Sequence, residues 1–469
     1  MTTPDMTDIN SPTRPPADVG ALDPTAVTVR ARVPGPAVSI GRIDDRTVVM
    51  CRLDAGDHLA ALSEAVSESL EAACSLALEK RLPLILIASS SGADIREGIG
   101  AAHGWGRAAR AMVQCSGHVP LLFIVSGAVV TGSALLLGIA DQVIMIDESY
   151  AFVSGPGMVE AYTGEPIETE ALGGADIHAT TSGLTSARAE SIEHALDIVA
   201  DMLSYLPSDN TALPPLTPID VSPDDSDPTL NDIVPKTPTG SYDVRAVIER
   251  IADPESFLEL RPRWAGNLVT GFATIGGHAV GVVANQPQIL AGTLNIAASH
   301  KGARFVSFCD AFNLPILTLV DTPGFQPGKD LEWRGMIRHG AQLAFAYARA
   351  TVPRISVTLR KSYGGAYIVM DSKPMGNDVA YAWPSAEIAV MGAKGAIEIL
   401  HRNADETERA QLEADYEERL LNPYRAAERG SIDAVIDPAE TRQRVAAALN
   451  VLASKRERLP RRRHDNIPL

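Results

Sequence analysis

Short apolar runs rich in β-forming residues alternate along this chain with long alanine-rich segments of helical period. The clearest runs cover residues 84–88, 121–125, 316–320 and 355–359. Continuous apolar runs of this length are typical of strands buried on both faces of a parallel sheet, and the helical segments between them are typical of crossover connections. The pattern therefore predicts an α/β fold.

The two halves of the chain repeat this pattern with matched spacing. The sequence LPLI around Pro83 corresponds to LPIL around Pro315. A Val-Pro pair ends 37 residues after Pro83 and 38 residues after Pro315, and a glycine follows at 49 and 50 residues. Agreement to within one residue at each anchor indicates an internal duplication. The same spacing aligns two strand-to-helix turns, VTGSA at residues 130–134 and YGGAY at residues 363–367.

The length of 469 residues exceeds what one hydrophobic core usually serves, so we expect two domains. We predict that they cover residues 37–206 and 240–469. Residues 1–36 are rich in Pro, Thr and Asp without an apolar period, which predicts a disordered leader outside the fold. Residues 207–239 carry many prolines, which predicts a linker without regular structure.

Charge and hydropathy exclude several classes of function. The formal net charge is −17, and basic residues gather only in a short stretch near the C-terminus, so we expect no nucleic-acid partner. The apolar stretch 120–140 is interrupted by Ser, Thr and Gly. This pattern is typical of a protein interior, so we expect no membrane span. No secretory signal is visible, and we predict a cytoplasmic protein.

Cysteine and histidine spacing indicates no metal site. The four cysteines form no CxxC pair and have no zinc-ribbon spacing, so we expect reduced thiols in the core. The histidines have neither HExxH spacing nor a nearby cysteine ligand set, and His339 reads as structural rather than as a neighbour of a substrate.

The two aligned turns are the candidate sites for chemistry. A turn of Gly, Ala or Ser that opens a helix leaves backbone N–H groups without intrahelical partners, and the helix dipole adds positive potential there. Such preorganised donors stabilise negative charge that develops on an oxygen. Glycine at these positions is also compatible with mere close packing of a helix against its strand, so the turns alone leave both interpretations open.

The second half resembles the carboxyltransferase β subunits of propionyl-CoA and acetyl-CoA carboxylases almost continuously from Tyr242 to Leu469. The matching segments are VGVVANQP at 280–287, KGARF at 301–305, VDTPGF at 320–325, IRHGA at 337–341, RKSYGGAY at 360–367 and AWPSAEIAVMGA at 382–393. These segments are long and specific, so they favour a functional turn in the second half.

The first half resembles the same family more patchily, and its turns depart from the family pattern. Shared segments include GP at 155–156, TGE at 163–165 and LSYLP at 203–207. Where the family has Ser-Gly-Gly-Ala-Arg, this chain has SSGAD ending at Asp94; where the family has Ala-Gly-Gly-Ala, it has VTGS, with Thr131 in place of a glycine. A β-branched residue restricts the backbone angles of that turn. The first-half site is therefore either adapted to an unusual acyl chain or has lost catalysis.

The resemblance implies a crotonase-type fold in each half and transfer of a carboxyl group from carboxybiotin to the α-carbon of an acyl-CoA. It implies that the amides of Gly365 and Ala366 hold the ureido oxygen of biotin, and that those of Thr131 and Gly132 hold the thioester oxygen. No side-chain base is required, because loss of CO2 leaves a basic biotin nitrogen. The substrate contacts implied are Gly92, Ala93, Gly324, Phe325, Tyr367 and Ile368. In the family the position of Ile368 faces the acyl pocket and is often Asp in propionyl-type enzymes, so an apolar residue there indicates either a different acyl preference or ordinary packing.

The resemblance also implies partners. The chain has no Met-Lys-Met biotin-attachment stretch and no P-loop, so biotin is expected on a separate α subunit that carries biotin carboxylase and carrier domains. A homohexamer or a mixed β oligomer with sites shared across a dimer interface is implied. Two alternatives stay open: a biotin-dependent acyl-CoA decarboxylase subunit that works with a membrane partner, and a non-catalytic scaffold.

Overall fold

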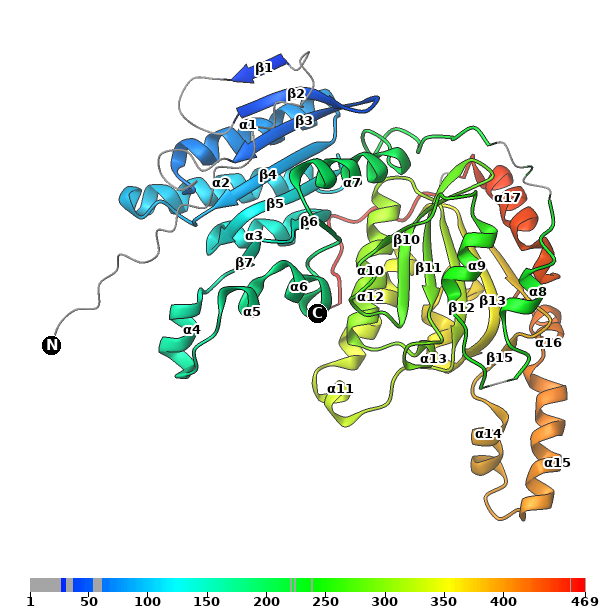
Figure 1. The fold of residues 1–469 in the computed structure, drawn as a ribbon. Coiled ribbons are helices and arrows are strands. Elements are labelled where there is room, and N and C mark those ends of the chain that lie inside the picture. Colours follow the sequence, from blue (N-terminus) through cyan, green and yellow to red (C-terminus); the bar gives the residue numbers. More distant parts are fainter. Residues whose placement is uncertain are drawn as a thin grey trace. The chain divides into compact units, whose positions relative to one another are not determined.

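The computed structural model describes residues 27–30, 37–53, 61–219, 222, 225–237, 239–455 and 457–468. The described chain divides into two compact units. The first unit takes its described residues from Met1–Ala179 and Leu184–Ala200, and the second takes them from Thr180–Gly183 and Asp201–Leu469. Each unit contains one twisted sheet with helices packed on it (Figure 1).

The sheet of the first unit has the order β1-β2-β3-β4-β5-β6-β8, and β7 pairs with β5. Its first three strands are antiparallel and the other pairings are parallel. The strands are β1 (Val27–Arg30), β2 (Ala37–Ile43), β3 (Arg46–Leu53), β4 (Leu84–Ser90), β5 (Leu121–Val130), β6 (Gln142–Ile146), β7 (Tyr150–Phe152) and β8 (Ala187–Ala189). The α-helices are α1 (Glu64–Lys80), α2 (Ile99–Cys115), α3 (Gly132–Ile139), α4 (Pro156–Thr163), α5 (Thr169–Gly173) and α6 (Ala175–Ile177), and α7 (Ile192–Tyr205) runs from this unit into the second.

The sheet of the second unit has the order β9-β10-β11-β12-β13-β14-β16, and β15 pairs with β13. The strands are β9 (Leu258–Leu260), β10 (Leu268–Ile275), β11 (His278–Asn285), β12 (Ile316–Thr322), β13 (Arg354–Tyr363), β14 (Val379–Ala382), β15 (Glu387–Ala389) and β16 (Ala434–Val435). The helices are α8 (Leu230–Ile233), α9 (Val244–Ile251), α10 (Ile296–Ala311), α11 (Lys329–Trp333), α12 (Met336–Arg349), α13 (Gly364–Val369), α14 (Ala393–Leu400), α15 (Glu406–Tyr416), α16 (Pro423–Glu428) and α17 (Thr441–Leu452).

Helices cover both faces of the second sheet. On one face, apolar residues of α9 and α17 form a core with alternate residues of the central strands. On the other face, Phe272 of β10 lies with its ring centroid 5.5 Å from that of Phe305 and 6.0 Å from that of Phe308, both on α10. Figure 1 shows α10 and α12 beside each other on this face. The near-continuous apolar runs of the sequence arise because both faces of the strands are buried.

The duplication predicted from spacing appears as matched topology. Each sheet begins with antiparallel strands, continues with parallel strands, and carries a short strand on the end of its longest one. The starts of the paired strands also correspond, because Leu84 lies opposite Leu121 in the first unit and Ile316 lies opposite Arg354 in the second. The α/β class and the four predicted strands are confirmed, although each strand extends beyond the predicted run.

Helix boundaries follow local capping chemistry. The Ser63 side chain accepts a hydrogen bond from the Val66 amide at the start of α1, and that helix ends at Arg81 in a left-handed conformation. In the second unit, Asn295 accepts a hydrogen bond from the Ala298 amide at the start of α10. These caps place α1 and α10 at corresponding points of the two units, directly before the strands β4 and β12.

Two predictions about irregular segments are wrong in part. Within the predicted leader 1–36, residues 27–30 form β1 and pair with β2, while residues 1–26 and 31–36 lie outside the described part of the chain. Within the predicted linker 207–239, α8 is helical, and its Leu230 is fully buried in the core of the second unit. Burial of Leu230 and Val234 in this core explains why the segment is ordered there despite its many prolines. In the described residues, no helix is long and apolar enough to cross a bilayer.

The burial of Lys301 on α10 is expected to make the free energy of unfolding depend on pH. Its Nζ donates to the carbonyls of Arg261 and Trp264, each at 2.9 Å, and burial lowers its pKa from 10.5 to about 7. Between these two values the unfolded chain binds more protons at Lys301 than the folded chain does, so the free energy of unfolding rises with pH. We expect wild type to gain about 1–2 kcal/mol over Lys301→Met between pH 7 and pH 9 in urea unfolding. Parallel pH curves for the two proteins would contradict this.

Candidate functional site

The two predicted turns occupy the same place in the two sheets. In the first unit β5 ends at Val130 and α3 begins at Gly132. In the second unit β13 ends at Tyr363 and α13 begins at Gly364. Both turns therefore lie at the carboxyl ends of parallel strands, where ligands bind in open α/β sheets.

Strand register fixes which residues of the two turns correspond. Ser90 lies opposite Val129 in the first unit, and Thr322 lies opposite Ser362 in the second, in each case after an irregularity in the register. Counting forward from these pairs, Thr131 corresponds to Gly364. Gly132 then corresponds to Gly365, and Ser133 corresponds to Ala366.

The corresponding residues share an unusual backbone conformation. Gly364 has φ +57°, and Thr131 has φ +59° with ψ −130°. This region is one that glycine adopts readily and a β-branched residue adopts only with strain. Thr131 therefore keeps the positive φ that glycine has at the corresponding position of the second turn.

We expect Thr131→Gly to raise the free energy of unfolding by about 1 kcal/mol. Relief of strain at positive φ is worth roughly 1–3 kcal/mol, and the greater freedom of glycine in the unfolded chain offsets part of it. Thr131→Ala keeps a Cβ and should gain less. Urea unfolding of the two variants beside wild type measures both effects, and a Thr131→Gly protein less stable than wild type would contradict the strain.

A second loop lies beside each turn. After β4, the Gly92 amide donates to the Ser90 hydroxyl at 3.3 Å, and after β12 the Gly324 amide donates to the Thr322 hydroxyl at 3.3 Å. Gly92 has φ +99° and Gly324 has φ +142°. The two loops are therefore built alike, as the duplication predicts.

Each loop turns one amide away from its neighbouring segment. The carbonyl of Gly92 accepts from Leu62 at 2.6 Å, and the carbonyl of Gly324 accepts from Leu294 at 3.1 Å. Because C=O and N–H of a trans peptide point in opposite directions, the amides of Ala93 and Phe325 point away from these partners. Each unit thus has candidate donors on two segments, one on the loop and one on the turn.

The loop and the turn of each unit are in contact. In the first unit a Cβ on Gly92 would lie 2.3 Å from the Thr131 hydroxyl oxygen, so glycine is required for this close approach. In the second unit a Cβ on Gly365 would lie 3.4 Å from the Phe325 ring. Amides from two touching segments at a helix start can act together on one anionic oxygen.

The predicted donor at Thr131 requires correction. Its N–H donates to the carbonyl of Phe152 on β7 at 2.9 Å, so it is engaged within the protein. The residues that correspond to Gly365 and Ala366 are Gly132 and Ser133, which open α3 and are the candidate donors of this turn. Sequence spacing aligned the turns correctly but did not reveal the bond to Phe152, which depends on the pairing of β5 with β7.

The other predicted substrate contacts differ in accessibility. The side chain of Ile368 on α13 is 47% exposed, which leaves it available to a ligand. Tyr367 packs against a small apolar cluster that includes Ala380 and Ile388, and burial raises the pKa of its hydroxyl. Asp94, which departs from the family pattern and is not among the predicted substrate contacts, is buried, caps a short helix through the Arg96 amide and forms an ion pair with Arg96 at 2.6 Å.

Two aromatic residues at the turns were missed in the sequence. The indole Nε1 of Trp105 on α2 donates to the carbonyl of Gly132 at 2.7 Å. The hydroxyl of Tyr363 donates to the Glu387 carboxylate, and burial together with this carboxylate raises the pKa of Tyr363. Tyr363 is the first residue of the turn 363–367 and could have been found from that position, whereas nothing in the local sequence of α2 points to Gly132.

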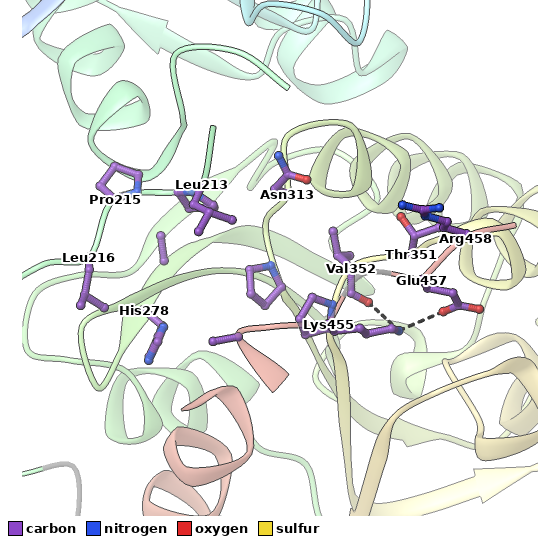
Figure 2. A pocket seen from close by; sticks show the side chains of 15 residues that line it. Leu213, Pro215, Leu216, His278, Asn313, Thr351, Val352, Lys455, Glu457 and Arg458 are labelled. Carbon is purple, nitrogen blue, oxygen red and sulfur yellow. Dashed lines mark hydrogen bonds and ion pairs between the residues drawn. The ribbon is translucent and has the colours of Figure 1, made fainter. Parts of the chain in front are cut away.

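A cavity of about 560 Å³ lies at the other end of the strands of the second sheet, where β12 and β13 begin (Figure 2). Asn313 and Pro315 before β12, and Thr351 and Val352 before β13, line it. Lys455 in this cavity donates to the carbonyl of Val352 at 3.1 Å. These residues precede the strands whose other ends carry the turns, so the cavity is not part of the candidate site.

The described residues contain no group of three or more His, Cys, Asp or Glu side chains arranged to hold a metal ion. His339 on α12 lies against His300 on α10, with 2.5 Å between His300 Nε2 and His339 Nδ1. Burial and the neighbouring His339 lower the pKa of His300. His339 therefore contacts the neighbouring helix, and its structural role stays a prediction.

Two similar sheets in tandem, each with an amide-bearing turn at the carboxyl end of its longest strand, define a protein of two crotonase-like domains. Comparison with known proteins places the chain within this class. The sequence model of the carboxyl transferase domain family matches residues 25–467 of this chain. The chain therefore belongs to the carboxyl transferase family. The predicted family and fold class are confirmed, and the chain is a carboxyltransferase.

Individual relatives agree with this assignment. The propionyl-CoA carboxylase beta chain of Roseobacter denitrificans is 44% identical over 92% of this chain and 85% of its own length. The biotin-dependent acetyl-/propionyl-coenzyme A carboxylase beta5 subunit of Mycobacterium tuberculosis is 43% identical over 93% of this chain and 82% of its own. A crystal structure of transcarboxylase 12S, a hexamer with methylmalonyl-coenzyme A and methylmalonic acid bound, matches with TM-score 0.93 and 39% identity over 96% of this chain and 91% of that one.

Proposed function

We propose that this chain transfers a carboxyl group from carboxybiotin to the α-carbon of an acyl-CoA. The observation that carries the proposal is the pair of register-matched turns, each of which opens a helix beside a loop with a further amide. The reaction develops negative charge on two oxygens, the ureido oxygen of biotin and the thioester oxygen of the acyl-CoA. Two donor sites of like construction suit two such oxygens.

The turn of the second unit suits the ureido oxygen. The amides of Gly365 and Ala366 begin α13, and the Phe325 amide lies on the touching loop. A neutral carbonyl oxygen that becomes more negative needs hydrogen-bond donors and no fixed cation, which is what these amides offer. When it is bound, carboxybiotin supplies the carboxyl group and, after release of CO2, a basic nitrogen. The amides contribute roughly 3 kcal/mol per donor to the stabilisation of the charge.

The turn of the first unit suits the thioester oxygen. We assign the donors there to Gly132 and Ser133, with the Ala93 amide on the adjacent loop. Gly92 at φ +99° lets that loop approach Thr131. Because the geometry of this turn follows that of the second unit despite the change to threonine, we favour a working acyl-CoA site over a non-catalytic scaffold.

The acyl group and the partners form part of the same proposal. Ile368 is apolar and partly exposed beside the second turn, which favours an acyl chain with apolar contacts at this position. Relatives named as beta chains of biotin-dependent carboxylases support a biotinylated α subunit as the partner. The hexamer of transcarboxylase 12S supports a homohexameric or mixed β assembly. The buried cysteines suit a reducing compartment, and a cytoplasmic location stays a prediction.

Reconstitution tests this function directly. The purified chain is mixed with a carboxylated biotin carrier and a panel of acetyl-, propionyl-, butyryl- and longer acyl-CoAs. We expect acyl-CoA-dependent loss of carboxyl from the carrier and formation of the carboxylated acyl-CoA, without any requirement for sodium. No transfer to any acyl-CoA would overturn the proposal and favour a scaffold, whereas dependence on sodium and a membrane partner would favour a decarboxylase subunit.

A further inference from the structure

Trp105 is placed to control the amide turn of the first unit. Its indole Nε1 donates to the carbonyl of Gly132, the first residue of α3, at 2.7 Å. A Cβ on Gly132 would lie 3.4 Å from the same indole ring, so the ring also packs against the start of the helix. The side chain reaches this turn from α2, a helix that precedes β5 in the sequence.

The hydrogen bond from Trp105, together with the helical backbone that begins at Gly132, holds the direction of the next amide. The peptide between Gly132 and Ser133 is trans, so its N–H points opposite to the carbonyl that Trp105 holds. The preceding peptide is fixed in the same way, because the Thr131 carbonyl accepts from the Ala134 amide at 3.2 Å. Both carbonyls are thus tied down on the protein side, and the amides of Gly132 and Ser133 are turned away from it.

The indole itself is held in place by close packing of its helix. The residue before it, Gly104, is buried, and a Cβ there would lie 2.7 Å from the Ser67 hydroxyl of α1. The α2 backbone therefore lies directly on α1 at this point. A rigid support of this kind lets one side-chain hydrogen bond hold a peptide in a fixed direction.

Among the described residues of the second unit, no aromatic side chain donates a hydrogen bond to the carbonyl of Gly365. There the ring beside Gly365 is Phe325, which comes from the adjacent loop and carries no N–H or O–H. The residue that corresponds to Phe325 in the first unit is Ala93, which cannot fill that space. The two units thus place an aromatic ring against the turn from different elements, and only the ring of the first unit can also orient a peptide.

We propose that Trp105 is a positioning residue for the acyl-CoA site: by holding the Gly132 carbonyl, it aims the Ser133 amide at the thioester oxygen. This role rests on the proposed carboxyltransferase function and adds to it the residue that fixes one of its donors. The substrate end that depends on Trp105 is the thioester carbonyl.

The test removes the indole N–H and reads the substrate carbonyl. In Trp105→Phe the ring remains and the donor is lost. We expect kcat for transfer to acyl-CoA to fall about tenfold, less than the 10²–10³-fold loss on deletion of a whole donor, with KM for acyl-CoA changed less than twofold. The ¹³C resonance of the bound thioester carbonyl should move upfield relative to wild type, because a weaker hydrogen bond polarises it less. His103→Ala, an exposed change on the same helix, should leave both readouts unchanged.

The possible results distinguish the positioning role of Trp105 from the proposed carboxyltransferase function. An unchanged kcat, an unchanged carbonyl resonance, or a loss confined to KM in folded Trp105→Phe protein would overturn the positioning role. If the phenylalanine variant does not fold, benzothienylalanine at position 105 keeps the shape of the indole without its N–H and is read by the same criteria. Failure of wild type to transfer carboxyl at all would instead overturn the proposed function. Loss of carboxyl from carboxybiotin without acyl-CoA should be the same in wild type and variant, because that step uses the turn of the second unit.

Discussion

Replacement of Gly365 by valine is expected to abolish carboxyl transfer while the protein stays folded. A Cβ at this position would lie 3.4 Å from the Phe325 ring, which is ordinary van der Waals contact, so the backbone can accept a side chain. The two γ-methyl groups of valine extend beyond this Cβ, and we expect them to occupy space at the opening of the turn. They would keep an oxygen from reaching the amides of Gly365 and Ala366. We expect at least a 100-fold loss of kcat, the effect of losing an oxyanion donor or more.

Matched variants separate loss of the site from loss of the fold. Gly365→Ala adds only the tolerated Cβ and should retain most of its activity. Gly395→Ala, on α14 with 3.8 Å to the nearest atom beyond the helix, changes a helical glycine away from the turns and should retain full activity. Circular dichroism and thermal unfolding check that each variant is folded. A folded Gly365→Val enzyme with more than a tenth of wild-type kcat would remove the turn of the second unit from the reaction.

The location of both turns could be predicted because strand and turn are local features of a duplicated pattern. The prolines at residues 83 and 315 directly precede buried strands, and the spacing from them to the glycines of the turns is preserved by the repeated topology. The apolar runs were readable because both faces of the strands are covered. The correspondence of Thr131 with Gly364 then follows from register.

The hydrogen-bond partners of the turn peptides could not be predicted, because these partners are distant in sequence. The Thr131 amide donates to Phe152, which belongs to a short strand paired with the end of β5. The Gly132 carbonyl is held by Trp105 across 27 residues. The strand at residues 27–30 was missed for the same reason, since its order comes from pairing with β2 and not from an apolar period of its own.

A buried cluster of hydrogen-bonded side chains around Asp321 stabilises the backbone that leads into the turn of the second unit. The Asp321 carboxylate at the end of β12 accepts from Tyr242 Oη at 2.8 Å and from Arg360 Nε at 3.1 Å. It also accepts from the Lys361 amide at 3.1 Å, two residues before the end of β13. Arg360 in turn donates to the carbonyl of Gly240 at 2.7 Å. One carboxylate therefore connects the end of β12, the end of β13 and the segment that leads into α9.

Asp321→Ala is expected to lower the free energy of unfolding by about 3–5 kcal/mol. The carboxylate is 2% exposed and burial raises its pKa, while Arg360 acts in the opposite direction and favours the charged form. Removal of the carboxylate leaves the buried Arg360 guanidinium without a counter-charge, which is the costly way to break such a pair. Asp321→Asn keeps the shape and some of the hydrogen bonds and should lose less. Glu428→Ala breaks an exposed ion pair with Arg425 and should change stability by less than about 1 kcal/mol. Urea unfolding of the three variants beside wild type measures these differences, and an Asp321→Ala protein as stable as Glu428→Ala would show that the cluster does not hold the turn.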